Sequence, residues 1–215
     1  MRGSFALLLE LMEVSLHHFL VESRAAGSGV EVRERCRLAH ETAMGIAYLH
    51  RNSYLHGDVK ALNVLMDATK RAKVCDFGIS AAIGVATRGE LPLAGEEPRQ
   101  CPHSEPLQSN GLGTLRYLAP ELVANTASLY DARCDVYSFG LLLWEVMHTK
   151  LAFDGSSEVA VAITLAPEGT RPTLDLPTGC DVLGSTISAC WHHDPAARPA
   201  MSTCVEEIGS LLEGL

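Results

Sequence analysis

The spacing of apolar residues predicts a chain that is mostly helical. Between Glu31 and His50, apolar residues recur at alternating steps of four and three, which is the period of one buried helix face. The segment 135–147 is apolar nearly all round, which is typical of a helix in the middle of a domain. A helix is also expected to start over 15–20, and two more are expected over 182–191 and 201–212.

Strands are expected only in the first third of the chain. Phe5–Glu10 has the character of a short buried strand, and 63–66 and 72–75 are two β-type runs joined by a tight turn. Everything after Asp76 is expected to be helix or loop. The stretch 85–113 contains four prolines and no periodicity, which predicts a long flexible loop of the kind that is usually functional.

Composition narrows the class of protein. A length of 215 residues favours one domain, and a net charge of -9 argues against a nucleic-acid surface. The seven cysteines are odd in number and form no CxxC pair, so a disulfide framework is not expected. A reducing compartment, and hence a cytoplasmic location, is expected instead. The apolar run "FALLL" is too short to span a membrane.

The polar residues within "YLHGDVKALNVL" (Tyr54–Leu65) suggest phosphate chemistry. Asp58 is a carboxylate that could accept a proton from a hydroxyl, and Lys60 could hold a phosphate as a point charge. Asn63 offers a neutral oxygen for a hard cation. Two strands joined by a tight turn would bring Asn63 beside Asp76, which predicts a magnesium site completed by substrate phosphates and water.

An ordered set of motifs gives these residues a family context. "HGDVKALN", then "DFG", then "APE" resemble the signature set of the eukaryotic protein kinases. "GTLRYLAPE", "DARCDVYSFGLLLWEV" and "CWHHDPAARP" extend the resemblance over essentially the whole chain. A lysine two places after the catalytic aspartate is the serine/threonine pattern, and the set is similar to the tyrosine-kinase-like group. Singly, Asp58 and Asp76 would more often be turn residues or helix caps; the ordered set reverses that reading.

The resemblance implies a role for each matching residue, with ATP and Mg²⁺ as cofactors. Asp58 would be the catalytic base, Lys60 would contact the transferred phosphate, and Asn63 and Asp76 would hold magnesium. Leu9 would be the gatekeeper, Glu10 and Met12 the hinge, Leu65 the floor under adenine, and Cys75 the border of the nucleotide pocket. Thr114 would position the substrate, and the structural residues would be His56, Phe77, Gly78, Glu121, Asp135 and Arg198.

The implied fold is α+β but mainly α: the large lobe of a protein kinase with a remnant of the small-lobe sheet. Residues 1–13 would be that remnant and the hinge, and 14–215 would be the large lobe with an activation-segment insert over about 85–112. Gly57 departs from the family, because an arginine that reads a phosphate usually stands there. Control through that contact is therefore not expected.

A second departure concerns the opposite side of the nucleotide site. The chain contains no glycine-rich GxGxxG loop, no strand lysine of the VAIK type and no helix glutamate to pair with it. We therefore expect it to be part of a longer kinase and to bind ATP weakly alone. The parent would phosphorylate protein serine or threonine, with possible regulatory domains outside this chain. The alternative is a non-catalytic interaction module. Such a module would have no physical reason to keep Asp58, Lys60, Asn63 and Asp76 together.

Overall fold

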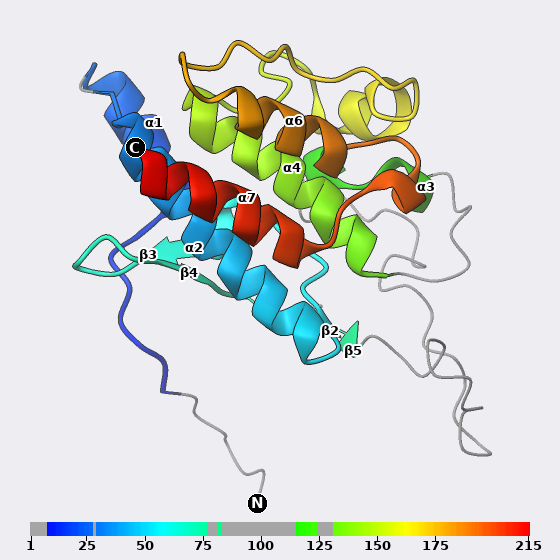
Figure 1. Ribbon diagram of the computed structural model, residues 1–215. Coiled ribbons are helices and arrows are strands. Elements are labelled where there is room, and N and C mark those ends of the chain that lie inside the picture. Colours follow the sequence, from blue (N-terminus) through cyan, green and yellow to red (C-terminus); the bar gives the residue numbers. More distant parts are fainter. Residues whose placement is uncertain (1–7, 28, 77–80, 83–114, 124–130) are drawn as a thin grey trace, which may run out of the picture.

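The computed structural model describes residues 8–27, 29–76, 81–82, 115–123 and 131–215. Two long helices, α2 and α4, pack against each other through its middle (Figure 1). In chain order the elements are β1 (Val14–Ser15), α1 (Leu16–Ala25), α2 (Val32–Arg51), β2 (Tyr54–Leu55), the 3₁₀ turn η1 (Ala61–Asn63), β3 (Val64–Met66), β4 (Ala72–Val74), β5 (Ala81–Ala82), the 3₁₀ turn η3 (Leu115–Tyr117), α3 (Pro120–Val123), α4 (Ala132–His148), α5 (Glu158–Ala160), the π-helical turn η4 (Val161–Leu165), α6 (Asp181–Cys190), the 3₁₀ turn η5 (Pro195–Ala197) and α7 (Met201–Gly214).

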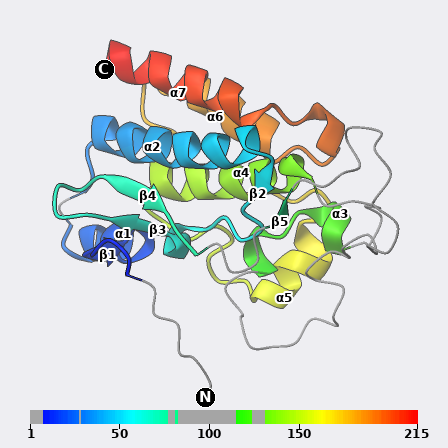
Figure 2. The ribbon, with the colours of Figure 1, turned by 90° about the horizontal axis from the view of Figure 1, so that it is seen from below.

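The helices are arranged in layers around α2. Figure 2 shows α2 between α7 and α4, with the small sheet and α1 on the side away from α7. The apolar face predicted for α2 is confirmed, because Cys36, Ala39, Ala43 and Ile46 are all fully buried. Helix α1 begins after Ser15, whose hydroxyl accepts a hydrogen bond from the His18 amide at 3.3 Å, an N-cap of the usual kind.

Helix α4 is the buried centre of the molecule. Thirteen of its residues, from Cys134 to Met147, are buried, as its nearly continuous apolar sequence predicts. Two of the thirteen, Asp135 and Glu145, are acidic. These two residues are only 1 % and 2 % exposed. A buried carboxylate requires hydrogen-bond donors around it, so these two residues mark where other segments are tied to the helix.

The strands form two small sheets, β1–β3–β4 and β2–β5, which confirm one sequence expectation and correct two others. β3 and β4 pair in antiparallel fashion with Val64 opposite Val74, as the tight turn between them predicts. The buried strand expected over Phe5–Glu10 is wrong for its described part: residues 8–10 form no strand, and Leu8 is 98 % exposed. The chain instead pairs with β3 from four residues after Glu10, at Val14–Ser15. The expectation of no strand after Asp76 is also wrong, because β5 pairs with β2.

Glycine at position 140 allows α4 to pack closely against the end of α6. A Cβ atom at this position would lie 2.8 Å from the Cys190 Cβ and 3.1 Å from the Trp191 amide nitrogen. We expect Gly140→Ala to lower the free energy of unfolding by about 1–3 kcal/mol, despite alanine's higher helix propensity, because the backbone must shift. Urea unfolding measures this change. Gly214→Ala in α7, where nothing lies within 4 Å of the new atom, is the control; equal stability of the two variants would contradict the prediction.

Candidate active site

The polar loop between β2 and β3 is held by one buried carboxylate. Asp135 Oδ2 accepts a hydrogen bond from the His56 amide at 2.8 Å, and Oδ1 accepts one from the Gly57 amide at 2.9 Å. The His50 ring nitrogen Nε2 lies 2.8 Å from the same Oδ2. Two consecutive loop amides and a histidine at the end of α2 therefore converge on α4, which fixes the loop backbone just before Asp58.

The His56 ring joins this loop to the end of β4. Its Nδ1 lies 3.2 Å from the Asp58 amide nitrogen, and its Nε2 lies 2.9 Å from the Cys75 carbonyl oxygen. An amide can only donate and a carbonyl can only accept, so the network assigns the proton to Nε2. His56 is fully buried, so the ring fixes Asp58 relative to the strand that leads to Asp76.

The three residues expected to act in catalysis lie together. Lys60 Nζ donates to Asp58 Oδ2 at 2.6 Å, and Asn63 Nδ2 donates to the same oxygen at 2.9 Å. Asn63 Nδ2 also donates to the Asp58 carbonyl at 2.8 Å. The two donors fix the Asp58 carboxylate, with Asn63 buried and with Asp58 and Lys60 partly exposed toward the surface.

The β3–β4 pairing places the two expected metal ligands at one end of the sheet. The Cys75 amide donates to the Asn63 carbonyl at 2.9 Å, so Asp76 follows directly after the residue paired with Asn63. Asp76 is exposed and has a φ of 62°, in the left-handed region that a non-glycine residue adopts rarely. Because Nδ2 makes both side-chain bonds of Asn63, its Oδ1 keeps its acceptor capacity. One amide oxygen and one carboxylate are ligands of the type that Mg²⁺ takes alongside phosphates, so these residues fit it.

The residues expected around adenine are only partly brought together. Leu65 in β3 and Cys75 are half-buried, and burial, followed by the charge of Asp76, raises the pKa of the Cys75 thiol. The expected gatekeeper, Leu9, is 73 % exposed. Lys73 Nζ lies 2.6 Å from Glu10 Oε1, an ion pair that ties the segment before β1 to β4. Met12 is half-buried. Phe77, Gly78, Thr114 and the insert 85–112 lie outside the described residues.

A second cluster holds the segment after the insert. Arg198 donates from both terminal nitrogens to the Glu121 carboxylate, at 2.6 and 2.8 Å. Two residues to which the resemblance gives structural roles therefore form one ion pair, and the Arg198 side chain is fully buried within it. The Arg198 guanidinium also lies 5.0 Å from the ring centroid of Tyr137, with Arg171 at 5.1 Å from the same ring. These contacts tie α3 to α4 and to the loop before α7.

The sequence pattern missed a third buried connection, centred on Glu145. The Tyr117 hydroxyl donates to Glu145 Oε2 at 2.6 Å, and the Ala152 amide donates to Oε1 at 2.9 Å. Burial raises the pKa of Glu145 from its ordinary 4.5 to about 7, although both bonds oppose the shift. Glu145 does interrupt an apolar helix in the sequence, but nothing in its spacing identifies Tyr117, 28 residues earlier, as its partner.

Arg116 fixes the same segment from its other side. Its guanidinium donates to the carbonyls of Ala152 at 2.6 Å, Phe153 at 2.9 Å and Ser156 at 3.1 Å. Glu158 lies 3.9 Å from its Nε. Three carbonyls in one short loop could not be inferred from sequence, because they depend on how that loop turns after α4.

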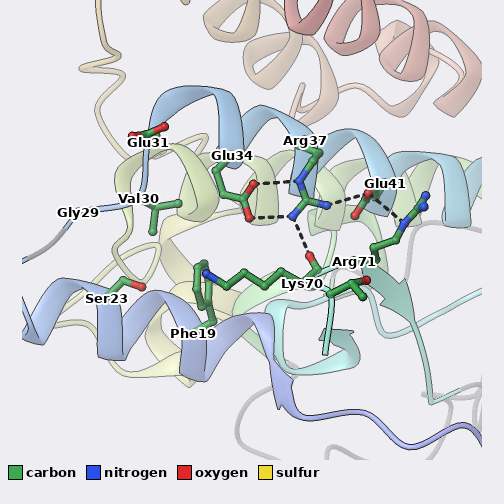
Figure 3. Close-up of a pocket in the computed structure, with 11 residues that line it drawn as sticks. Phe19, Ser23, Gly29, Val30, Glu31, Glu34, Arg37, Glu41, Lys70 and Arg71 are labelled. Carbon is green, nitrogen blue, oxygen red and sulfur yellow. Dashed lines mark hydrogen bonds and ion pairs between the residues drawn. The ribbon is translucent and has the colours of Figure 1, made fainter. Parts of the chain in front are cut away.

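One hollow in the described residues lies away from these clusters. It is bounded by α1, the first half of α2 and the β3–β4 turn, and Figure 3 shows its side chains. Arg37 bridges Glu34 and Glu41 at 2.7 and 2.8 Å and donates to the Lys70 carbonyl, so much of the charge here is already paired. None of the residues expected to act in catalysis lines this hollow.

A family model and the similar curated proteins both indicate the same class of protein. The family model described as "Protein tyrosine and serine/threonine kinase" matches residues 1–208. Receptor-interacting serine/threonine-protein kinase 4 of Mus musculus is 33 % identical over 187 residues, which cover 83 % of this chain and 22 % of the relative. Serine/threonine/tyrosine-protein kinase HT1 of Arabidopsis thaliana is 34 % identical over 170 residues, covering 79 % of this chain and 38 % of the relative.

These comparisons cover most of this chain but only part of each relative. The chain spans between about a fifth and two fifths of the lengths of these two proteins. Within the described residues, no helix is both long enough and apolar enough to cross a membrane.

The role of Asp135 can be tested by removing its charge and one acceptor. We expect Asp135→Asn to lower the free energy of unfolding by about 2–4 kcal/mol, because one loop amide would face an NH₂ group in a buried site. Urea unfolding measures the change, with Asp154→Asn, at an exposed loop position, as the matched control. A loss no greater than that of the control would show that the carboxylate does not hold the loop.

Glu145 predicts a pH dependence of stability. Its folded pKa of about 7 lies above the ordinary 4.5, so between these values the folded protein binds a proton that the unfolded chain does not. The resulting stability is fully present below about pH 4.5 and is lost as the pH rises through 7. The full change is on the order of 3 kcal/mol.

Glu145→Gln removes this titration and keeps the shape of the side chain. Relative to this variant, the unmodified protein should lose unfolding free energy as the pH is raised from 5 to 7.5. Other titrating groups cancel in the difference, and Glu206→Gln, at an exposed position of α7, should leave the pH profile unchanged. Parallel profiles of the unmodified protein and Glu145→Gln would contradict the assignment.

Proposed function

The chain belongs to the protein tyrosine and serine/threonine kinase family, and we propose that it carries the catalytic machinery for transferring the γ-phosphate of ATP to serine and threonine hydroxyls of proteins. One observation carries the proposal: Lys60 Nζ and Asn63 Nδ2 both donate to the same oxygen of Asp58. A carboxylate held by a cation and an amide, partly exposed at the end of a fixed loop, is suited to orient an incoming hydroxyl.

Each residue of the cluster has a part in the transfer. Asp58 accepts the hydrogen bond, and finally the proton, of the substrate hydroxyl as its oxygen attacks the γ-phosphorus and the bond to ADP breaks. Lys60 supplies positive charge close to the transferred phosphoryl group. Asn63 and Asp76 would hold Mg²⁺, which when bound neutralises phosphate charge. The protein's contribution is positioning and electrostatics, which is what phosphoryl transfer requires.

Two features support serine and threonine as the acceptors. Lys60 stands two places after Asp58, in the serine/threonine pattern, and the mouse relative is named a serine/threonine-protein kinase. Gly57 adds a prediction about control. It has a φ of 81° and no side chain to read a phosphate, so we propose that activity is independent of a phosphate bound through this position.

The organisation around the site is part of the same proposal. Residues 1–13 would connect to the nucleotide-binding side and 14–215 would form the large lobe, with the insert over about 85–112 as the activation segment. Regulatory domains outside these residues are proposed because the relatives are much longer. A cytoplasmic location is proposed from the sequence, because its seven cysteines are odd in number and form no CxxC pair.

One observation favours a second function, that of a non-catalytic interaction module. Leu8, Leu9 and Leu11 are 98 %, 73 % and 89 % exposed, which is an unusual concentration of apolar surface in four residues. A partner that covers this segment could bind without any phosphoryl transfer. The two functions predict different effects of mutating Asp58. Phosphoryl transfer requires this residue, whereas binding through residues 8–11 does not, because Asp58 lies in the loop between β2 and β3.

The catalytic proposal predicts Mg²⁺-dependent transfer that requires Asp58. The chain is incubated with Mg·ATP and a serine/threonine peptide library, and phosphopeptides are counted by mass spectrometry. We expect slow transfer that rises throughout the millimolar range of ATP, because these residues include no glycine-rich loop or strand lysine. Asp58→Asn should reduce the rate at least about 100-fold, whereas Asp154→Asn should leave it unchanged.

A second readout makes a negative result decisive. With Mn²⁺ and ATP, paramagnetic broadening of amide resonances should be strongest around Asn63 and Asp76, and Asn63→Ala should weaken it. Transfer that survives Asp58→Asn would contradict the assigned role of this residue. Absence of both transfer and broadening would overturn the catalytic proposal for this chain in favour of the interaction module.

A further inference from the structure

The end of α6 and the beginning of α7 bring two cysteine sulfurs into contact. Cys190 is the last residue of α6 and Cys204 is the fourth residue of α7. Their Sγ atoms lie 3.4 Å apart, and both residues are fully buried. Six cysteines of the described chain are free thiols, and this is the pair among them whose sulfur atoms lie in contact.

The position of the pair limits how far its sulfurs can move apart. Gly140 of α4 packs directly against the Cys190 backbone and Cβ, while Cys204 approaches from α7. A disulfide needs the sulfurs to close to about 2.05 Å, a further approach of about 1.4 Å. The two helices therefore hold the sulfurs in contact, already close to bonding distance.

We propose that Cys190 and Cys204 are a redox pair, which hydrogen peroxide or another hydroperoxide oxidises to a disulfide joining α6 to α7. One thiolate attacks a peroxide oxygen and becomes a sulfenic acid, and the O–O bond breaks. The second sulfur then displaces the sulfenic oxygen, which leaves as water. Two thiols lose two protons and two electrons in total, and one hydrogen peroxide is reduced to two waters.

Burial sets the rate of this oxidation. The contact with Cys204, followed by burial, raises the pKa of the Cys190 thiol well above its usual range. The thiolate is the reactive form, so oxidation at neutral pH is slow and accelerates as the pH rises. The same burial shields the finished disulfide from reducing thiols. The pair is thus a slow, persistent crosslink and not a fast sensor.

The crosslink would close a loop with structural consequences. Residues 190–204 include Arg198, whose two nitrogens hold Glu121 in α3. Closing a loop of this length lowers the conformational entropy of the unfolded chain. The folded protein has already lost that entropy, so the crosslink destabilises only the unfolded state. The oxidised protein should therefore melt at a higher temperature, by roughly 6–12 °C if the native geometry is unstrained.

The test is oxidation of the folded full chain followed by mapping of the thiols. Reduced protein is treated with hydrogen peroxide at pH 7 and pH 8.5, quenched, alkylated in denaturant and digested with chymotrypsin, which cleaves after Trp191 and so separates the two cysteines. We expect a peptide pair linked through Cys190 and Cys204, faster formation at pH 8.5, and the higher melting temperature.

Matched variants distinguish a redox pair from two thiols that only fill space. Cys204→Ser should abolish both the linked peptides and the rise in melting temperature, whereas Cys180→Ser, at another fully buried cysteine, should abolish neither. A variant that keeps only Cys190 and Cys204 repeats the experiment without competing thiols. Recovery of both cysteines as alkylated thiols or as sulfinic acids in that folded variant would overturn the proposal, as would a link from Cys190 to Cys180 in the unmodified chain.

Discussion

The buried carboxylate of Asp135 is the interaction on which the candidate active site depends. It lies in the first turns of a helix that is otherwise apolar, and it is only 1 % exposed. A charge in such a place costs free energy unless donors surround it, and here the donors are two consecutive loop amides and a histidine. The need to satisfy Asp135 therefore determines the loop conformation, and that conformation places Asp58, Lys60 and Asn63 together.

The same helix organises the segment on the other side of the site. Glu145, near the far end of α4, binds Tyr117 and the Ala152 amide, while the guanidinium groups of Arg171 and Arg198 both lie close to the Tyr137 ring. Helix α4 thus serves as a rigid core to which two loops, distant in sequence, are attached by polar contacts. Preorganisation of this kind is what a reaction governed by positioning requires.

The sequence predicts the helices and the catalytic loop well because both leave local signals. A face repeating every three to four residues identifies α2, and a continuous apolar run identifies α4. The ordered motifs give the expected positions of Asp58 and Asn63, which the structure brings together. The strand expected over Phe5–Glu10 is wrong in its described residues, 8–10, because an apolar run shows only a preference for burial, and pairing needs a partner in register. The short β5 pairing and the Glu145–Tyr117 bond depend on tertiary placement and leave no periodic signal.

Native-state hydrogen exchange of the His56 and Gly57 amides tests whether Asp135 fixes the loop. Both hydrogens are donated to a carboxylate buried inside the protein, so they should exchange only through global unfolding, at the same free energy as the core amides of α4. Exchange of these two amides at a much lower free energy, comparable to that of exposed residues outside the helices and strands such as Leu8 and Leu11, would contradict this assignment. The loop would then move independently of Asp135, and the position of Asp58 would need another cause.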